Sequence, residues 1–283
     1  MAVIPPWAAE VPLGAAVAQG LVERQFPALA PARVELLGEG WDNTAFLVNG
    51  SWVFRFPRRE AAVALLETEL RVLPRIARRL PLAVPVPQLR GEPDLSFPWP
   101  FAGHRLLPGV TADRAALRPE ERLRCAEPLG RFLRALHDIP PGGLPADGIG
   151  RLEAQRLRAE IRRRLADPPS FVDDPVRQPR ADTLVHGDLH ARQLLFEGGA
   201  LCGAIDWGDV HRGDPAVDLA AVHAFLPPAA REAFLAAYGP VDEETWRLAR
   251  LRALHVSAAL AEYAKETADG PLLEEAAAAI ARI

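Results

Sequence analysis

The stretch LVHGDLHARQLLF, residues 184–196, sets polar and charged side chains between two apolar ends. Its first residues complete a predicted short strand. Asp188 lies just after that strand, where a carboxylate can accept the proton of an attacking hydroxyl group. Gln193 lies five positions further on, and its amide oxygen can bind a metal ion. A solvated loop is the simpler alternative, because aspartate is common in turns.

A second acidic segment, GAIDWGDVHRGDPAVDLA, covers residues 203–220. Asp206 directly follows a short apolar strand, and a hard carboxylate there suits Mg²⁺, which prefers oxygen ligands. Asp214 and Pro215 predict the start of a helix, with Asp214 as the N-cap and Pro215 in the first helical position. Asp218 lies on that helix, where it either ties back to the 184–196 loop or faces solvent.

Nearer the N-terminus, the glycine-rich turn GEGWDN at residues 38–43 separates two predicted strands, so Gly38, Gly40 and Asn43 lie in a hairpin. A dinucleotide-binding glycine motif would open a helix, and a Walker A loop would need Gly-Lys-Ser/Thr, so neither motif fits. A glycine hairpin can fold over phosphate groups and offer them backbone N–H donors. An ordinary hairpin, with glycine supplying the turn geometry, is the alternative.

Arg55 stands in the middle of the next predicted strand, WVFRFP. A cation there suits an inward-pointing phosphate anchor, and an arginine on an exposed strand face is the alternative. Glu69, on the predicted helix that follows, can pair with Arg55 and orient it. Glu67 points elsewhere, because helix residues two apart do not share a face.

Composition is that of an ordinary globular protein: 283 residues, 49% hydrophobic and 25% charged, with a formal net charge of −4. This charge gives no indication of a general nucleic-acid binder. No apolar run approaches the roughly 18 residues of a membrane span, and the N-terminal residues lack the pattern of a secretory signal. Two cysteines are too few for a disulfide framework. We therefore expect a cytoplasmic protein with no membrane or nucleic-acid partner.

Hydrophobic periodicity divides the chain near Pro108. On the N-terminal side it predicts a helix within 10–30, strands within 33–40, 43–50 and 51–57, a helix over 60–80 and a strand within 101–109. On the C-terminal side it predicts helices over 119–139, 151–166, 216–226, 229–239 and 243–266, with two short strands around the loop in 184–206. The predicted fold class is α+β, with a small antiparallel-sheet lobe, residues 1–107, and a mostly helical lobe, residues 108–283.

The order of these motifs across two lobes is far more specific than any one of them. The sequence resembles the aminoglycoside phosphotransferase family, relatives of protein kinases and choline kinase, most clearly in its HGDLH loop and in IDWGD…GDPxxDLA. FRFPR and LPLAVPVPQ add to the resemblance, which covers nearly the whole chain. It implies a bilobal protein-kinase-like fold that holds ATP or GTP and Mg²⁺.

Site roles follow from the resemblance position by position. Asp188 resembles the catalytic base, Asp206 the Mg²⁺ ligand, and Glu69 the helix glutamate that orients the phosphate-binding cation. Leu106 and Leu107 resemble the hinge that reads the nucleotide base. The N-terminal lobe would then bind nucleotide, and the C-terminal lobe would carry the catalytic loop and the acceptor site.

Two positions depart from the family pattern. Arg55 stands where lysine is usual, and arginine differs from lysine in reach and geometry. Gln193 stands where an asparagine Mg²⁺ ligand is usual, and its amide lies one methylene further out. Mg²⁺ demands near-ideal octahedral distances, so this extra length can weaken one metal site.

The leading functional hypothesis is an ATP- or GTP-dependent O-phosphotransferase that acts on a hydroxyl group of a small molecule, such as an aminoglycoside or a similar antibiotic. Acidic residues of the C-terminal lobe, with Asp209, Glu262 and Glu266 as candidates, could attract a cationic acceptor. A solvated helix face is the simpler explanation for Glu262 and Glu266. The sequence identifies neither the acceptor nor the oligomeric state.

Two alternatives stay open at this point. A nucleotide-binding pseudokinase with a regulatory or binding role is motivated by Arg55 and Gln193. A metallohydrolase would use a histidine-rich set of metal ligands, comprising His186, Asp188, His190 and His211. The second alternative lacks the ligand spacing that zinc sites favour.

Overall fold

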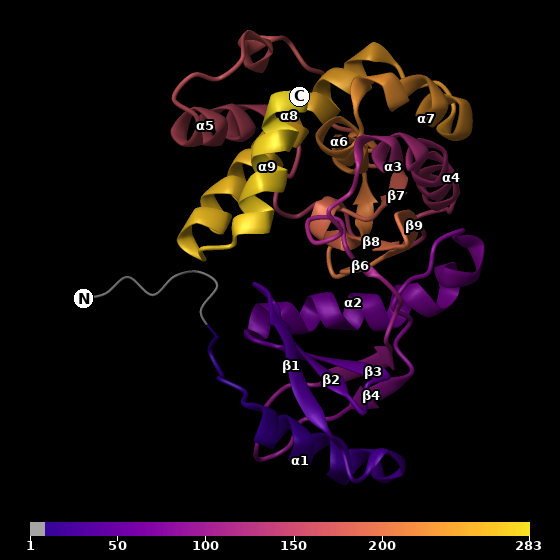
Figure 1. The fold of residues 1–283 in the computed structure, drawn as a ribbon, viewed down its shortest axis with the longest axis vertical. Helices are drawn as coiled ribbons and strands as arrows, with labels where there is room; N and C mark the ends of the chain where they lie inside the picture. The colour runs from indigo at the N-terminus through magenta and orange to yellow at the C-terminus, as the bar shows by residue number, and fades with distance from the viewer. Residues whose placement is uncertain (1–8) are drawn as a thin grey trace. The chain divides into compact units, whose positions relative to one another are not determined.

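The computed structural model describes residues 9–283, which divide into two compact units (Figure 1). Unit 1 runs to Arg78 and resumes over Val84–Leu107. Unit 2 takes Arg79–Ala83 and Pro108–Ile283.

Unit 1 is an antiparallel sheet with strand order β1-β2-β3-β5-β4 and two helices. Its elements are α1 (Ala15–Gln25), β1 (Val34–Glu39), β2 (Asn43–Val48), β3 (Trp52–Pro57), α2 (Glu60–Ile76), β4 (Leu89–Gly91) and β5 (Phe101–Arg105). Asn49 and Gly50 turn the chain between β2 and β3 with φ values of 52° and 64°. These left-handed conformations are the ones that an Asn-Gly hairpin turn requires.

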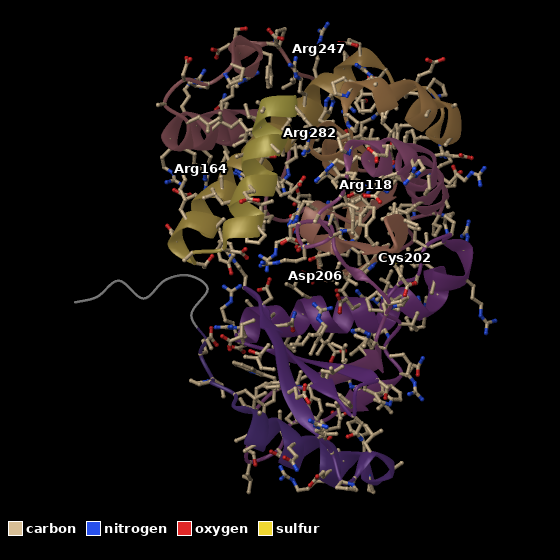
Figure 2. The ribbon with its side chains drawn as sticks, in the orientation of Figure 1. Arg118, Arg164, Cys202, Asp206, Arg247 and Arg282 are labelled. Atoms are coloured by element: carbon tan, nitrogen blue, oxygen red, sulfur yellow. The ribbon has the colours of Figure 1, made fainter. Side chains whose placement is uncertain are left out.

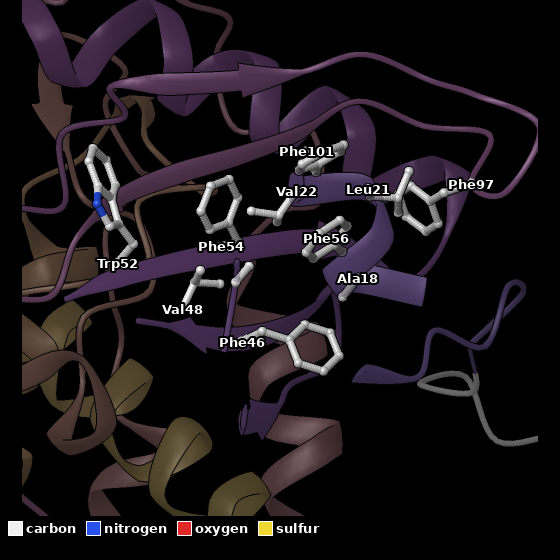
Figure 3. Packing of buried hydrophobic residues seen from close by; sticks show 11 residues of the cluster. Ala18, Leu21, Val22, Phe46, Val48, Trp52, Phe54, Phe56, Phe97 and Phe101 are labelled. Carbon is white, nitrogen blue, oxygen red and sulfur yellow. The ribbon is translucent and has the colours of Figure 1, made fainter. Parts of the chain in front are cut away.

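The core of unit 1 is aromatic and lies between the sheet and α1. Phe46, Phe54, Phe56 and Phe101 are all at most 1% exposed, and the rings of Phe56 and Phe101 stack at 4.4 Å (Figure 3). Because side chains alternate along a strand, Arg55 points to the opposite face from its neighbours Phe54 and Phe56. Helix α2 packs on that opposite face (Figure 1), so α2 and Arg55 meet there.

Unit 2 is mostly helical. Its helices are α3 (Pro119–Arg124), α4 (Ala126–His137), α5 (Ala154–Arg164), α6 (Ala216–Phe225), α7 (Arg231–Tyr238), α8 (Glu243–Glu266) and α9 (Gly270–Arg282). Its strands are β6 (Val110–Thr111), β7 (Thr183–Val185), β8 (Leu194–Glu197), β9 (Ala200–Ala204) and β10 (His211–Gly213). They form a three-stranded sheet of order β6-β8-β9 and a separate β7–β10 pair. The core helix is α6, which is buried along almost its whole length and packs on α8 and α9.

The antiparallel sheet in one unit and the helices in the other confirm the predicted α+β fold class. The helix predicted over 119–139 is wrong as one element, because the structure divides it into α3 and α4 at Cys125. The physical reason is Pro128, which has no N–H to continue the hydrogen-bond ladder and so is tolerated only in a first turn. Pro74 lies in the last turn of α2 and does not divide that helix.

The sequence analysis did not predict the strands β4, β6 and β10 or the C-terminal helix α9, and it predicted two strands around 184–206 where the structure has β7, β8 and β9. The strands β4, β6 and β10 have two or three residues each, too few to show a period. Among residues 9–283, no helix is both long and apolar enough to cross a membrane.

Candidate active site

The loop after β7 turns sharply at Gly187. This residue has a φ of 92°, and a Cβ atom built there would lie 2.3 Å from the carbonyl oxygen of Asp209. Only glycine tolerates both the left-handed backbone and this close approach. The loop therefore lies directly against the segment that follows β9, the region in which both acidic motifs of the sequence meet.

Asp218 on α6 binds the backbone of this loop. Its carboxylate accepts hydrogen bonds from the backbone N–H groups of His186, at 2.8 Å, and Gly187, at 2.9 Å. His137 on α4 contacts the same carboxylate through Nε2 at 3.1 Å. Burial alone would raise the pKa of Asp218, but the His137 hydrogen bond and the loop N–H groups outweigh burial and hold that pKa below its usual value. Of the two expectations for Asp218, the tie to the loop is the one that the structure shows.

His186 links the loop to the strand that leads to Asp206. Its Nδ1 accepts the N–H of Asp188 at 3.4 Å, so Nε2 carries the proton and donates to the Ile205 carbonyl at 3.0 Å. The ring packs against buried Trp207 at 4.7 Å. Both ring nitrogens are therefore used within the protein, which makes His186 a scaffold residue.

Asp188 is presented at the tip of this scaffold with 36% of its side chain exposed. Its Oδ2 lies 3.5 Å from Nε2 of His190, and its Oδ1 lies 3.7 Å from Nη2 of Arg252. Partial burial would raise the pKa of Asp188, but interactions with His190 and Arg252 outweigh burial and lower it. The carboxylate is therefore ionised at neutral pH, the form in which it can accept a proton.

Gln193 and Asp206 are brought side by side by one backbone contact. The N–H of Ile205 donates to the carbonyl of Gln193 at 2.9 Å. The side-chain oxygen Oε1 of Gln193 is buried and has no hydrogen-bond partner among the described residues. Asp206, labelled in Figure 2, is exposed and adopts a φ of 65°, a strained conformation for a residue with a side chain. A buried amide oxygen without a partner and an exposed carboxylate, carried by adjoining backbone segments, fit a hard cation such as Mg²⁺.

In unit 1, Arg55 forms the expected pair with Glu69. Its Nη1 donates to both carboxylate oxygens, at 2.6 and 2.7 Å, and the two side chains are 13% and 4% exposed. Glu67 points away from this pair and binds Arg90 on the surface, at 2.8 Å. The buried arginine is thus held in one orientation by the helix.

The glycine hairpin and the predicted hinge also lie in unit 1. A Cβ atom at Gly38 would meet nothing within 4 Å, and one at Gly40 only a carbonyl at 3.7 Å, so packing does not explain either glycine. Oδ1 of Asn43 is buried without a hydrogen-bond partner in the described chain. At the hinge, the Leu106 N–H donates to the Ser51 carbonyl at 2.9 Å, so that donor is already used, and Leu107 ends the unit.

Two of the three acidic candidates for binding a cationic acceptor are paired with arginines. Asp209 forms an ion pair with Arg151. Glu262 accepts from Arg163 at 2.7 Å and from Arg164 at 2.9 Å, and these arginines lower its pKa to about 2. Glu266 is exposed at the end of α8. Glu262 thus forms an inter-helix ion pair between α5 and α8.

Sequence reasoning missed Arg252 and His137. Both contact the loop from helices far away along the chain, α8 and α4. Their positions follow no local motif, and only tertiary packing brings them to the loop.

Asp214 contacts the start of α6 and also a segment distant in sequence. The structure begins α6 at Ala216, one residue later than expected, and Oδ1 of Asp214 accepts the Ala216 N–H at 3.0 Å. The same buried carboxylate binds the guanidinium of Arg177 at 2.5 Å. Such one-residue differences at helix ends are common.

The metallohydrolase alternative gains no support. Across residues 9–283, no group of three or more His, Cys, Asp or Glu side chains is arranged to hold a metal ion. His190 uses Nδ1 to accept the Arg192 N–H at 3.3 Å, and Nδ1 of His211 lies 2.7 Å from the Asp209 carbonyl. These histidines hold the backbone of their loops.

Residues 33–254 match the model of a phosphotransferase enzyme family. An aminoglycoside 3'-phosphotransferase of Escherichia coli is 30% identical over 130 residues, which are 40% of this chain and 48% of that protein. The chain thus spans about half the length of this curated relative.

Solved structures show the same fold. The GDP complex of an aminoglycoside 2'-phosphotransferase-IIIa superposes with a TM-score of 0.71 at 22% identity, covering 95% of this chain and 98% of that one. The macrolide 2'-phosphotransferase MphH from Brachybacterium faecium superposes with a TM-score of 0.62 at 24% identity, covering 94% and 97%. At these identities the likeness concerns the fold.

Proposed function

Because the chain belongs to the phosphotransferase enzyme family, we propose that it transfers the γ-phosphoryl group of ATP or GTP to a hydroxyl group of a small molecule. The observation that carries this proposal is the Asp188 carboxylate. It is ionised, partly exposed, and set on a loop that buried Asp218 and His186 hold in place. Phosphoryl transfer needs mainly such positioning together with neutralisation of charge.

In the proposed reaction, the acceptor hydroxyl donates a hydrogen bond to Asp188 and attacks the γ-phosphorus. A bond forms between the hydroxyl oxygen and phosphorus, and the bond from phosphorus to the bridging oxygen breaks. The proton passes to Asp188, and the nucleoside diphosphate leaves with the bonding electron pair. Because Asp188 is ionised before the reaction, it can accept this proton without a preceding deprotonation.

Asp206 and Gln193 are the residues that would hold Mg²⁺, since one offers a carboxylate and the other a buried oxygen without a partner. Bound Mg²⁺ would neutralise negative charge on the phosphate groups. Protein sites for Mg²⁺ typically supply one or two ligands and leave the rest to phosphates and water, which agrees with a set of two.

Unit 1 is proposed to bind the nucleotide. Arg55, oriented by Glu69, would contact phosphate, and the hairpin of Gly38, Gly40 and Asn43 would cover the phosphate groups. The strand end at Leu106 and Leu107 would contact the base. Residues 1–107 would thus form the nucleotide-binding lobe, and residues 108–283 would carry the catalytic loop and the acceptor site.

The acceptor is a small molecule with a free hydroxyl group. The named relatives are phosphotransferases of aminoglycosides and macrolides, so these two antibiotic classes belong in the first acceptor panel. Location in the cytoplasm stays a prediction.

The test is transfer of phosphate from ATP or GTP, with Mg²⁺, to a panel of hydroxyl acceptors, followed by ³¹P NMR of the products. Asp188→Asn is expected to lower kcat by about 10²- to 10⁴-fold. Asp182→Asn is the matched control, because Asp182 is exposed just before β7, and it should retain activity. Turnover that does not respond to Asp188→Asn would overturn the proposal. Stabilisation by nucleotide without transfer to any acceptor would instead favour the pseudokinase.

A further inference from the structure

Arg252 is a buried cation beside the exposed carboxylate of Asp188. It lies on α8, is 7% exposed as a residue, and brings Nη2 to within 3.7 Å of Oδ1 of Asp188. This distance is an ion-pair contact but is too long for a hydrogen bond. A buried charge is costly unless its hydrogen-bonding groups are satisfied, so the partners of the guanidinium are informative.

The guanidinium has five N–H donors, and the protein satisfies few of them. Within the described chain, one hydrogen bond is formed, between Nη1 and Nδ1 of His255 at 3.3 Å. No nitrogen of Arg252 is among the fully buried atoms without a partner. Nε and Nη2 therefore keep some contact with solvent, although only 8% of the side chain is exposed, and Nη2 lies next to the partly exposed carboxylate of Asp188. A ligand would thus find two adjacent groups here. The Asp188 carboxylate can accept a proton, and Nη2 of Arg252 can donate hydrogen bonds.

The surroundings of Arg252 are cationic. Burial and the charges of Arg151 and Arg156 all act to lower its pKa, and the nearby carboxylates of Asp188 and Asp147 act against this. Asp147 is itself engaged by Arg151, at 2.8 Å. Of the two carboxylates near Arg252, Asp147 is thus already paired with Arg151, and only Asp188 is left to balance the charge of Arg252.

Three further carboxylates that could attract a cation are paired with arginines, whereas Glu266 is exposed at the end of α8. Asp209 pairs with Arg151, and Glu160 and Glu262 share Arg163 and Arg164 between α5 and α8. A polycationic acceptor would have to displace these arginines, whereas an anionic group finds open donors on Arg252.

We propose that Arg252 binds an oxyanion of the acceptor, a carboxylate or a phosphate monoester, placed next to the hydroxyl group that Asp188 deprotonates. The inference rests on the proposed phosphotransferase function and adds the chemical class of the acceptor. The planar fork of arginine matches the two oxygens of such a group and can bind both at once. One end of the acceptor would thus be fixed by Arg252 while its hydroxyl group contacts Asp188.

The test compares acceptors that differ only in charge. A hydroxycarboxylic acid, its primary amide, the hydroxyalkyl phosphate and the amino alcohol of the same length are assayed for kcat/KM with saturating nucleotide and Mg²⁺. We expect an oxyanion to exceed the amide by about 10- to 100-fold, the range of a hydrogen bond to a charged group, and the amino alcohol to be poorest. Comparison of the acid with the phosphate identifies which oxyanion the site takes.

Variants then assign the preference to Arg252. Arg252→Gln is expected to reduce the ratio of acid to amide toward 1, mainly through KM of the acid, and Arg252→Lys should retain part of the preference. Arg247→Gln is the matched control, because Arg247 is an exposed residue of α8 that pairs with Glu243 at 3.5 Å. It should leave the ratio unchanged. Nucleotide-induced thermal stabilisation of each variant checks that it is folded.

The outcomes separate this inference from the function on which it rests. A wild-type enzyme that prefers the amino alcohol or an aminoglycoside overturns the inference and leaves the proposed function standing. An equal loss of kcat with acid and amide in Arg252→Gln also overturns it, because the arginine would then serve the transferred phosphoryl group or orient Asp188. Failure to phosphorylate any acceptor removes the proposed function and, with it, this inference.

Discussion

The side-chain oxygen of Gln193 is buried and accepts no hydrogen bond from the described chain. Such an oxygen costs roughly 1–3 kcal/mol of stability unless a ligand satisfies it. The segment that carries Asp206 lies next to Gln193, because the Ile205 N–H donates to the Gln193 carbonyl. The glutamine at this position thus carries a buried oxygen that the described chain leaves without a hydrogen-bond partner.

Gln193→Met should raise the free energy of unfolding of the metal-free protein by about 1 kcal/mol, because it removes a buried oxygen that lacks a partner. The same change should weaken any Mg²⁺-dependent stabilisation in the presence of nucleotide. Urea denaturation in EDTA, and then with Mg²⁺ and nucleotide, measures both effects. Gln193→Asn keeps an amide and serves as the control. A marked loss of stability in EDTA would show that the oxygen is already satisfied.

Arg55 and Glu69 should be strongly coupled in folding, because both side chains are nearly buried. A double-mutant cycle with Arg55→Met and Glu69→Met is expected to give a coupling energy of about 1–3 kcal/mol in urea denaturation. The control is Arg90 with Glu67 on the same helix, an exposed pair that should couple by less than about 1 kcal/mol. Equal coupling in the two cycles would contradict this role of burial.

At the level of helices and strands, the loop after β7 depends on α6 and α4 as well as on its own residues His186 and Gly187. Asp218 on α6 binds two loop N–H groups and His137 of α4, and His137 in turn lies 2.7 Å from the hydroxyl group of Tyr238 on α7. The loop and α4 thus meet at the buried carboxylate of Asp218, and α7 is linked to it through His137. The Asp-Pro pair predicted the start of α6 from the sequence. For Asp218, the sequence left open whether it contacts the loop or faces solvent.

Asp218→Asn should destabilise the protein by roughly 3 kcal/mol. The new amide turns a donor toward the loop N–H groups, and hydrogen bonds to a charged acceptor are worth about 1.5–3 kcal/mol each. Activity should fall at the same time, because the loop that carries Asp188 loses its support. Chemical denaturation and kcat measure the two effects.

Asp173→Asn is the control for Asp218→Asn, since 74% of the Asp173 side chain is exposed in its pair with Arg162. It should change stability little. A fully active Asp218→Asn protein with wild-type stability would rule out the role assigned to α6.

Over the chain as a whole, buried neutral histidines should determine the response of stability to acid. Burial lowers the pKa of His104 and His223 to about 4 and that of His255 to about 3. In the unfolded chain these groups titrate near 6.5. As the pH falls below about 6.5, the unfolded state binds protons that the folded state does not, so the free energy of unfolding decreases.

The decrease should reach at most about 1.4 kcal/mol per histidine for each pH unit between pH 6.5 and 4. Urea denaturation at pH 7.5, 6.5, 5.5 and 4.5 measures it. His223→Leu should make the slope shallower, because one of the three groups is removed. A stability that stays constant from pH 7.5 to 5.5 would contradict the burial of these histidines.

Several features follow from local sequence. The apolar periods of the strands and long helices predicted the α+β architecture, and the motif order indicated the family, which the family match confirms. Each depends on residues close together in the chain, where a turn, a pleat or a helical period has a local physical cause. The division of the predicted 119–139 helix before Pro128 has an equally local cause, since this proline lacks the N–H that a continuous helix needs.

Other features depend on tertiary packing. Arg252 and His137 reach the loop after β7 from α8 and α4, and Glu262, a surface carboxylate by its spacing, pairs with two arginines of α5. The charge around Asp188 therefore arises from segments that are distant in the chain. Local patterns specify which side chains a segment carries and which face it buries, but the burial and pairing of a charge depend on whichever other segment packs against it.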